Sequence, residues 1–314
     1  MAEGPGKGPV LVAGGVNIDI GGQSAAPLVS RDSNPGTVTI SLGGVGRNIA
    51  HDLRLLGVET SLLTALGEDA YAREVERSCR ALGIGLDAAL RVPGGRTSTY
   101  LFISGPDGDM ALAVSDMELY KTLTPEYFQR QLPLLRQAAV VAADTNLPED
   151  SLRYLAQHST APLFVDPVSV PKAAKLRGIL GRIHTIKPNR LEAELLSGVT
   201  IRDRESLEQA AKALLETGLQ RVFITLGGEG TYAAQGDRRC FLPAYPAQAR
   251  NATGGGDAFA AGLIWAYLQG MDLKESAQAA TAAASIAVEG EETINPALSP
   301  QAVQERIRTL EEEV

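Results

Sequence analysis

The chain has 314 residues, of which 44% are hydrophobic and 21% charged, and its formal net charge is −8. This composition is typical of a globular protein with a sizeable core, and the negative charge argues against a nucleic-acid partner. Two cysteines are too few for a disulfide framework or a cysteine zinc site, and because we find neither a transmembrane stretch nor a secretion signal, we expect a cytoplasmic protein without a membrane partner.

The first part of the chain alternates strands and helices after a tail at 1–8, which contains glycine and proline and which we expect to be flexible. Short apolar or β-branched runs predict the strands, and apolar residues at helical spacing predict the helices. The expected elements are a strand at 10–13, a strand at 37–42, a helix opening at 43–48 and ending at Gly57, a strand at 61–65, and a helix at 70–82.

Two β runs at 97–103 and 110–114 flank Gly105–Gly108, which predicts a hairpin. This hairpin and the helix-poor segment 21–42 interrupt the regular alternation of strands and helices. We therefore expect these two parts of the chain to form a small separate sheet.

The rest of the chain returns to regular alternation, with strands expected near 139–143, 163–166, 183–186 and 222–226. Such alternation predicts an α/β domain with a parallel sheet covered by helices on both faces. In this architecture ligands bind at the carboxyl ends of the strands. Polar side chains follow these strand ends at Asp144, Asn146, Asp166 and Asn189.

Three consecutive glycines, Gly254, Gly255 and Gly256, precede Asp257 and an alanine-rich apolar segment. Bare backbone at the start of a helix offers N–H donors to an anion. Asp257 can then accept a proton from a hydroxyl that attacks a phosphoryl group held over the glycines, which is the chemistry of a kinase. The alternative is an N-cap carboxylate, but a cap does not need the glycines.

Three other motifs can each be interpreted either as a purely structural feature or as a binding site. Gly43–Asn48 is either a strand-to-helix turn or a backbone surface for a polyhydroxylated ligand, to which Asn48 donates. Lys187–Glu192 is either a capping box or a magnesium-phosphate site. Thr225–Gly230 is either a tight turn or a ledge for a nucleotide. The sequence has no GxxxxGK[ST] motif, so a Walker-type NTPase is not supported.

In this order, and together with Asn17-Ile18-Asp19, the motifs resemble the PfkB family of carbohydrate and nucleoside kinases. The resemblance covers essentially the whole chain after the tail. It implies a ribokinase-like three-layer α/β domain over 9–314, with a central, mostly parallel sheet. A small β lid would come from segments at about 21–42 and 91–117. Because the lid of relatives often forms a dimer interface, the resemblance also implies a homodimer.

The resemblance assigns roles by position. Asp257 would be the general base, and the backbone of Gly254, Gly255 and Gly256 the anion hole. ATP would be bound by Lys187, Asn189, Thr225, Gly227, Gly228 and Gly230, with Asn189 and Glu192 organising magnesium indirectly. The sugar would be held by Asn17, Asp19, Gly43, Gly44, Arg47 and Asn48.

Within the family, residues 32–36, 43–50, 165–169 and 184–194 are most similar to the kinases that act on pseudouridine. This similarity implies phosphorylation of the 5′-hydroxyl of that nucleoside by ATP. The candidate base contacts are Ser33, Thr99, Asp116 and Asn146. The alternatives are another sugar or nucleoside kinase, of the ribokinase or inosine type, and an inactive binding protein on the same fold. Family members that need potassium usually carry Asp where this chain has Asn251, which leaves the potassium requirement open.

Overall fold

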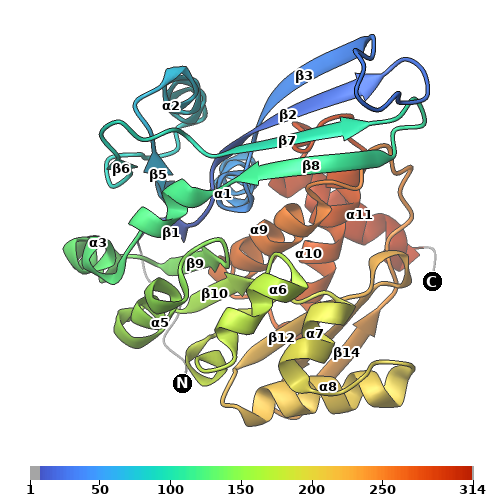
Figure 1. The fold of residues 1–314 in the computed structure, drawn as a ribbon. Helices are drawn as coiled ribbons and strands as arrows, with labels where there is room; N and C mark the ends of the chain where they lie inside the picture. Colours follow the sequence, from blue (N-terminus) through green and yellow to red (C-terminus); the bar gives the residue numbers. More distant parts are fainter. Residues whose placement is uncertain (1–7, 313–314) are drawn as a thin grey trace.

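The computed structural model describes residues 8–312, so the predicted flexible tail lies almost wholly outside the described residues. The centre of the protein is an eight-stranded sheet with the order β14-β13-β12-β11-β10-β9-β1-β4 (Figure 1). The strands from β4 to β12 pair in parallel, and β13 and β14 extend the sheet in antiparallel fashion. The strands are β1 (Val10–Ala13), β4 (Thr60–Leu63), β9 (Val140–Asp144), β10 (Leu163–Asp166), β11 (Thr185–Ile186), β12 (Arg221–Thr225), β13 (Thr231–Gln235) and β14 (Arg238–Leu242).

The inner strands of the central sheet are largely apolar because alternate side chains enter two different hydrophobic cores. In β1, Val10 and Val12 belong to one core, whereas Leu11 and Ala13 belong to the other. Neither face of such a strand can be left in water, and helices must therefore cover both.

Helices do cover both faces, which confirms the predicted three-layer α/β architecture. The core of one face includes α1 (Val45–Leu55), α2 (Ala70–Leu82), α9 (Gly255–Leu268), α10 (Leu273–Val288) and α11 (Pro300–Glu312). The core of the other face includes α3 (Pro125–Arg130), α4 (Leu132–Leu135), α5 (Glu149–His158), α6 (Val170–Ala173), α7 (Arg190–Ser197) and α8 (Arg204–Glu216). None of the helices between residues 8 and 312 is long and apolar enough to cross a membrane.

Helix α2 has the predicted bounds because the sequence marks both of its ends. The Asp69 side chain accepts a hydrogen bond from the backbone N–H of Ala72 at 2.8 Å, as an N-cap residue does. Gly83 ends the helix with a φ of 70°, a left-handed conformation that glycine adopts without strain.

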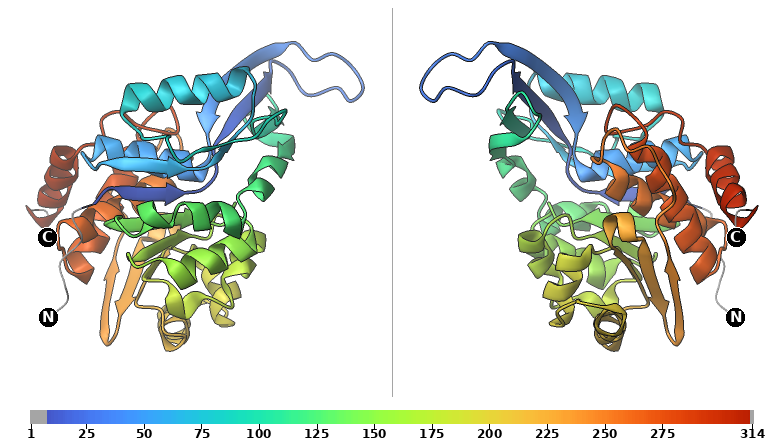
Figure 2. Two further views of the ribbon diagram at one scale, coloured as in Figure 1. Left: turned by 90° about the vertical axis from the view of Figure 1, so that its left-hand side faces the viewer. Right: turned by 90° about the vertical axis from the view of Figure 1, so that its right-hand side faces the viewer.

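A second sheet, here called the outer sheet, has the strand order β3-β2-β7-β8 and projects from one side of the molecule (Figures 1 and 2). Its strands are β2 (Asn17–Ser24), β3 (Gly36–Gly43), β7 (Thr99–Ser104) and β8 (Met110–Asp116). The loop between β2 and β3, residues 25–35, extends beyond the rest of the protein (Figure 2). The sequence analysis predicted strands at β3, β7 and β8 but not at β2. The short strands β5 (Ala65–Leu66) and β6 (Leu90–Arg91) pair separately.

Candidate active site

Helix α9 begins with glycines because its surroundings leave no room for side chains there. Gly254 precedes the helix with a φ of 89°, and a Cβ on it would lie 2.0 Å from the carbonyl oxygen of Thr293. A Cβ on Gly255 would lie 2.9 Å from Cγ1 of Val288. No side chain caps this end of the helix. Its first N–H groups are therefore available to an anionic ligand.

Asp257 is the third residue of α9, and its Oδ2 accepts a hydrogen bond from Asn48 Nδ2 at 2.8 Å. Burial and then the charge of Asp166 raise the pKa of Asp257 to about 7, although the Asn48 hydrogen bond and Lys187 oppose the shift. Gly254 occupies the N-cap position, so Asp257 is not the capping residue that the sequence left as an alternative. A carboxyl group that titrates near neutrality is suited to accept a proton.

Lys187 and Asp166 form a buried ion pair, with Nζ 3.1 Å from Oδ2 and neither side chain more than 10% exposed. Burial disfavours the charged form of Lys187, but Asp166, then Asp257 and Glu192, outweigh it and raise the pKa of the ammonium group. A Cβ on Gly256 would lie 3.4 Å from Nζ, so the ammonium lies against the first turn of α9. This combination of a fixed positive charge and a helix N-terminus suits a phosphate group.

Asn189 and Glu192 form the capping box of α7. Asn189 Oδ1 accepts from the Glu192 backbone N–H at 2.9 Å, and Glu192 Oε2 accepts from the Asn189 backbone N–H at 2.8 Å. Burial raises the pKa of Glu192, which is only 2% exposed. The structural interpretation of this motif is thus correct, and the remaining carboxylate oxygen, Oε1, is free of the capping box. Within residues 8–312, no three His, Cys, Asp or Glu side chains are grouped so that they could hold a metal ion by themselves.

A pocket of about 570 Å³ is lined by residues of two predicted motifs, the segment 225–230 after β12 and the glycines at the start of α9. Its lining from these motifs consists of Thr225, Gly227, Gly228, Gly230, Gly255 and Gly256. Gly230 has a φ of 120°, and a Cβ on it would lie 2.0 Å from the Leu242 carbonyl oxygen, so its conformation and its packing both require glycine. The predicted nucleotide-binding residues between 225 and 230 therefore share one pocket with the glycines of α9.

The same pocket has walls that the sequence did not reveal. These are residues between 244 and 252, Phe259 of α9, and one face of α10. On α10, Thr281 and Ser285 carry the polar groups. The Thr281 hydroxyl is buried and has no hydrogen-bond partner among the described residues. The sequence of an alanine-rich helix gives little indication of a ligand site, and a single threonine in it would be interpreted as a core residue.

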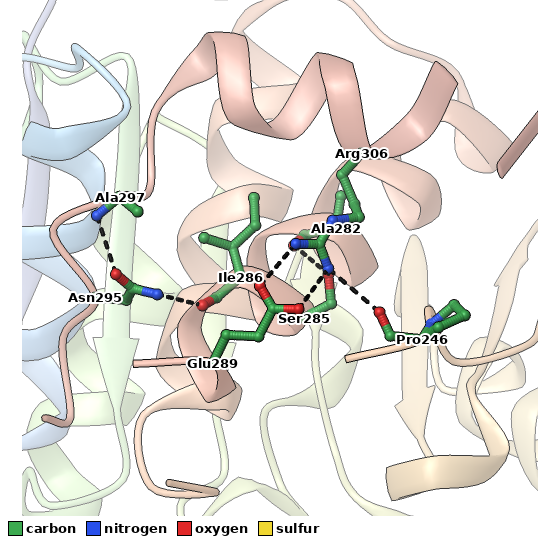
Figure 3. A network of polar contacts seen from close by, with 8 residues as sticks. All are labelled: Pro246, Ala282, Ser285, Ile286, Glu289, Asn295, Ala297 and Arg306. Atoms are coloured by element: carbon green, nitrogen blue, oxygen red, sulfur yellow. Dashed lines mark hydrogen bonds and ion pairs between the residues drawn. The ribbon is translucent and has the colours of Figure 1, made fainter. Parts of the chain in front are cut away.

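The C-terminal helix α11 supports two of these walls through Arg306 (Figure 3). Its Nη1 donates to the Pro246 carbonyl oxygen at 3.3 Å and to Ser285 Oγ at 3.1 Å, and its Nη2 donates to Glu289 Oε2 at 2.7 Å. Asn295 closes the end of α10 by donating to the Ile286 carbonyl oxygen at 2.7 Å (Figure 3). Pro246 and Ser285 both line the pocket, so Arg306 fixes their separation.

A second hollow, a cleft of about 1070 Å³, lies between the outer sheet and the main domain. One wall includes Asp19, Thr39, Ser41, Tyr100 and Phe102 of the outer sheet, and another includes Arg47, His51, Asn251, Thr253 and residues 291–294. Residues 251–256 thus border both hollows, since Asn251 and Thr253 face the cleft and Gly255 and Gly256 face the pocket.

Of the six predicted sugar-binding residues, Asp19 and Arg47 line this cleft, and Asn17 and Gly43 lie against Asp19. Asp19 accepts from Asn17 Nδ2 at 2.5 Å, and burial raises the pKa of Asp19 although this bond and Arg47 oppose it. A Cβ on Gly43 would lie 2.0 Å from Asp19 Oδ2, so the glycine makes room for the carboxylate. Gly44 has a φ of 99° and joins β3 to α1.

Arg47 also lines the cleft, but its guanidinium has structural partners. Nη1 donates to the Leu42 carbonyl oxygen at 3.0 Å, and Nη2 donates to Ser78 Oγ at 3.1 Å. Arg47 therefore ties the end of β3 to α2. Burial lowers the pKa of its guanidinium. Within residues 8–312 the side chain has no ion pair with a carboxylate.

The four predicted base contacts are not brought to the cleft. Thr99 and Asp116 line a hollow on the opposite face of the outer sheet, because side chains of a strand alternate between faces and Tyr100 occupies the cleft side. Ser33 is exposed in the loop beyond the far end of β2. Asn146 lines neither hollow, and its Oδ1 accepts from Lys172 Nζ at 2.5 Å.

Comparison with known proteins adds a family and several relatives. A family described as pfkB family carbohydrate kinase matches residues 9–300. The pseudouridine kinase of Escherichia coli K12 is 39% identical over 296 residues, which cover 93% of this chain and 94% of the relative.

Two solved structures extend the comparison to the fold. A carbohydrate kinase from Agrobacterium tumefaciens has a TM-score of 0.82 and 30% identity, with 96% of this chain and 97% of that chain covered. Arabidopsis thaliana ribokinase, complexed with ribose and ATP, has a TM-score of 0.86 and 23% identity, with 96% and 99% covered. The predicted ribokinase-like fold is therefore confirmed.

Proposed function

Since the chain belongs to the pfkB family of carbohydrate kinases, we propose that it transfers the terminal phosphoryl group of ATP to the 5′-hydroxyl of pseudouridine. The chain is an ATP-dependent kinase of a small sugar or nucleoside. The observation that carries the proposal is the loop 251–256, which borders the glycine-lined pocket on one side and the cleft on the other. Asp257 is the next residue after this loop in the sequence, and a phosphoryl group that passes from one hollow to the other moves past the loop.

The nucleotide binds in the 570 Å³ pocket with its phosphates directed at the start of α9. The N–H groups of Gly255 and Gly256 and the ammonium of Lys187 meet the terminal phosphate there. Donors that are already in place stabilise the charge that builds up on the transferring group, and this is the larger part of catalysis in phosphoryl transfer.

Asp257 is the general base. Its carboxylate accepts the proton of the 5′-hydroxyl while the hydroxyl oxygen forms a bond to the terminal phosphorus. The bond from that phosphorus to the bridging oxygen breaks, and ADP leaves with the bonding electrons. Asn48, through its 2.8 Å hydrogen bond, holds the carboxylate in place. A positioned base contributes about 10²- to 10⁴-fold to such a step.

Magnesium is compatible with the residues present, although this chain alone does not enclose it. A magnesium ion in a kinase usually takes one or two carboxylates, water molecules and the substrate phosphates. Glu192, whose second carboxylate oxygen is not engaged by the capping box, and Asn189 stand beside Lys187 and would act on the ion through water. When bound, magnesium neutralises charge on the phosphates of ATP.

The nucleoside occupies the cleft, with Asp19, Asn17 and Asn48 as partners of the sugar hydroxyls. The aromatic rings of Tyr100 and Phe102, whose centroids lie 5.9 Å apart, offer apolar faces to the base. The outer sheet acts as the lid that keeps water from the transferring phosphoryl group.

A substrate panel tests the choice of nucleoside. The protein is incubated with ATP and magnesium and with pseudouridine, uridine, inosine or ribose, and ADP release is measured for each. We expect the highest kcat/KM with pseudouridine. Good turnover of ribose or inosine without turnover of pseudouridine would assign the chain to another substrate within the family.

The outer sheet also supports a homodimer. Its face away from the cleft is apolar and exposed: Val38 and Val114 are each more than 60% exposed, and Leu101 and Leu112 lie on the same face. A contiguous exposed apolar face marks an interaction site, and in a two-fold dimer the same face of a second copy would cover it. Sedimentation analysis of the protein and of Val38→Lys checks this: we expect a dimer for the first and a monomer for the second.

A further inference from the structure

Helix α1 contains a group of buried polar atoms that have no hydrogen-bond partner in the part of the chain that the structure describes. They are Arg47 Nε, Asn48 Oδ1, His51 Nδ1 and both carboxyl oxygens of Asp52. Asp52 is the most unusual of them, because it is 1% exposed and neither oxygen accepts a hydrogen bond from any described residue. A buried carboxylate without a partner is strongly disfavoured, so the group must take another form or serve another purpose.

Asp52 lies on the helix face that carries Asn48. The two residues are four positions apart, and side chains at that spacing are neighbours on one face of a helix. Asn48 on this face reaches across to Asp257 of α9. Burial, followed by the nearby charge of Asp257, raises the pKa of Asp52 well above its usual range, although Arg47 opposes the shift. Burial without a partner favours the neutral carboxylic acid over the carboxylate, and the acid has one O–H to donate.

Asn48 has an acceptor that such an O–H can reach along the helix face. Its Nδ2 donates to Asp257, but its Oδ1 is buried and accepts no hydrogen bond from any residue between 8 and 312. The two ends of an amide group have nearly the same shape, so only hydrogen-bond partners decide which end faces which way. If Oδ1 faced Asp257, two acceptors would meet, and the general base would lose its support.

We propose that Asp52 is a positioning residue whose carboxylic acid donates a hydrogen bond to Asn48 Oδ1 and so turns Asn48 Nδ2 toward Asp257. Asp52, Asn48 and Asp257 then form one chain of hydrogen bonds from the core of the protein to the reacting hydroxyl. The proposal rests on Asp257 as the general base of the proposed function. Arg47 does not take this place in the structure: its two terminal nitrogens donate to Leu42 and Ser78, and its Nε makes no hydrogen bond with Asn48 Oδ1.

Two substitutions at one position test the hydrogen bond. Asp52→Asn keeps a donor of similar shape, and Asp52→Leu removes the donor but keeps the volume. We expect kcat of Asp52→Asn to stay within about threefold of the unsubstituted protein and kcat of Asp52→Leu to fall about tenfold, because one buried hydrogen bond is lost. The KM for ATP should change in neither variant. Equal losses for the two variants, or no loss for Asp52→Leu, would overturn the proposal.

A double-mutant cycle with Asn48→Ala shows whether Asp52 acts through Asn48. In the Asn48→Ala background, Asp52→Leu should lower kcat by less than about twofold, since nothing is left to position. A tenfold loss in both backgrounds would mean that Asp52 acts by another route. Thermal unfolding of all variants verifies that they fold. Asp257→Asn separates the two hypotheses: if it keeps full activity, the proposed base is wrong, whereas an inactive Asp257→Asn with an unaffected Asp52→Leu refutes only the role of Asp52.

Discussion

The two ends of the proposed active site, the nucleotide end and the nucleoside end, are built differently. The nucleotide end is made of backbone: glycines, the start of α9 and the turn after β12 leave bare N–H groups around a pocket. The nucleoside end is made of side chains on the strands of the outer sheet. At the first end the predicted residues lie together, whereas at the second Thr99 and Asp116 face the wrong way. A binding site made of backbone can be recognised in a sequence by its glycines. A binding site made of side chains on a strand cannot, because the sequence does not show which face of the sheet each residue occupies.

Substitution of Asp257 tests the nucleotide end most directly. Asp257→Asn keeps the shape and removes the base, so kcat should fall about 10²- to 10⁴-fold with little change in the KM for ATP. ADP release with saturating substrates measures this. Asp150→Asn, an exposed residue at the start of α5, is the matched control and should have unchanged kcat. Unchanged turnover in Asp257→Asn would show that the glycines and the carboxylate at this end are not a phosphoryl-transfer site.

The pH profile follows from the pKa of Asp257, which burial raises to about 7. In the proposed mechanism the carboxylate form is the active one, so kcat/KM should level off above this pH and fall about tenfold for each unit below it. Two units below the midpoint, the loss should be about a hundredfold. The measurement is kcat/KM between pH 5 and about pH 9. A flat profile over this range would mean that the ionisation of Asp257 does not limit the reaction.

The central domain was largely predictable because its local signals agree with its packing. Continuous apolar runs predicted β1, β9 and β10, and Gly83 predicted the end of α2, whose start Asp69 caps in the structure. The strand β2 was missed because its two glycines, Gly21 and Gly22, and its polar residues weaken every strand signal. It is held by pairing with β3 and β7, which lie far away along the sequence.

The nucleoside end was less predictable for the same reason. The residues of β7 alternate between the cleft and the outer face, and nothing in the sequence shows where the alternation starts. Thr99 pairs with Ile18 and Tyr100 with Asp19, and this register puts Tyr100 into the cleft beside Asp19. The walls formed by residues 291–294 and by α10 were missed because they carry no glycine motif.

A pair of neighbouring substitutions on β7 tests the difference between the two faces. Tyr100→Ala removes an aromatic ring from the cleft and should raise the KM for the nucleoside about tenfold, since an aromatic contact is lost. Thr99→Ala changes the other face and should leave this KM within about twofold. Initial rates at varied nucleoside concentration give both values. A larger effect of Thr99→Ala than of Tyr100→Ala would reverse the assignment of the faces.

The smallest effect is expected at Thr281, the side chain of the nucleotide end that no motif revealed. Its hydroxyl is buried, lines the pocket and has no partner within residues 8–312, so a bound nucleotide is the group that can satisfy it. Thr281→Val keeps the shape and should raise the KM for ATP about fivefold with kcat unchanged, because the contact is the same in the ground state and the transition state. Thr281→Ser, which keeps the hydroxyl, is the control. In the absence of nucleotide, Thr281→Val should unfold at a temperature equal to or above that of the unsubstituted protein, since an unpaired buried hydroxyl is removed. A rise in the KM for ATP without any loss of stability would show that side chains, and not backbone alone, select the ligand at this end as well.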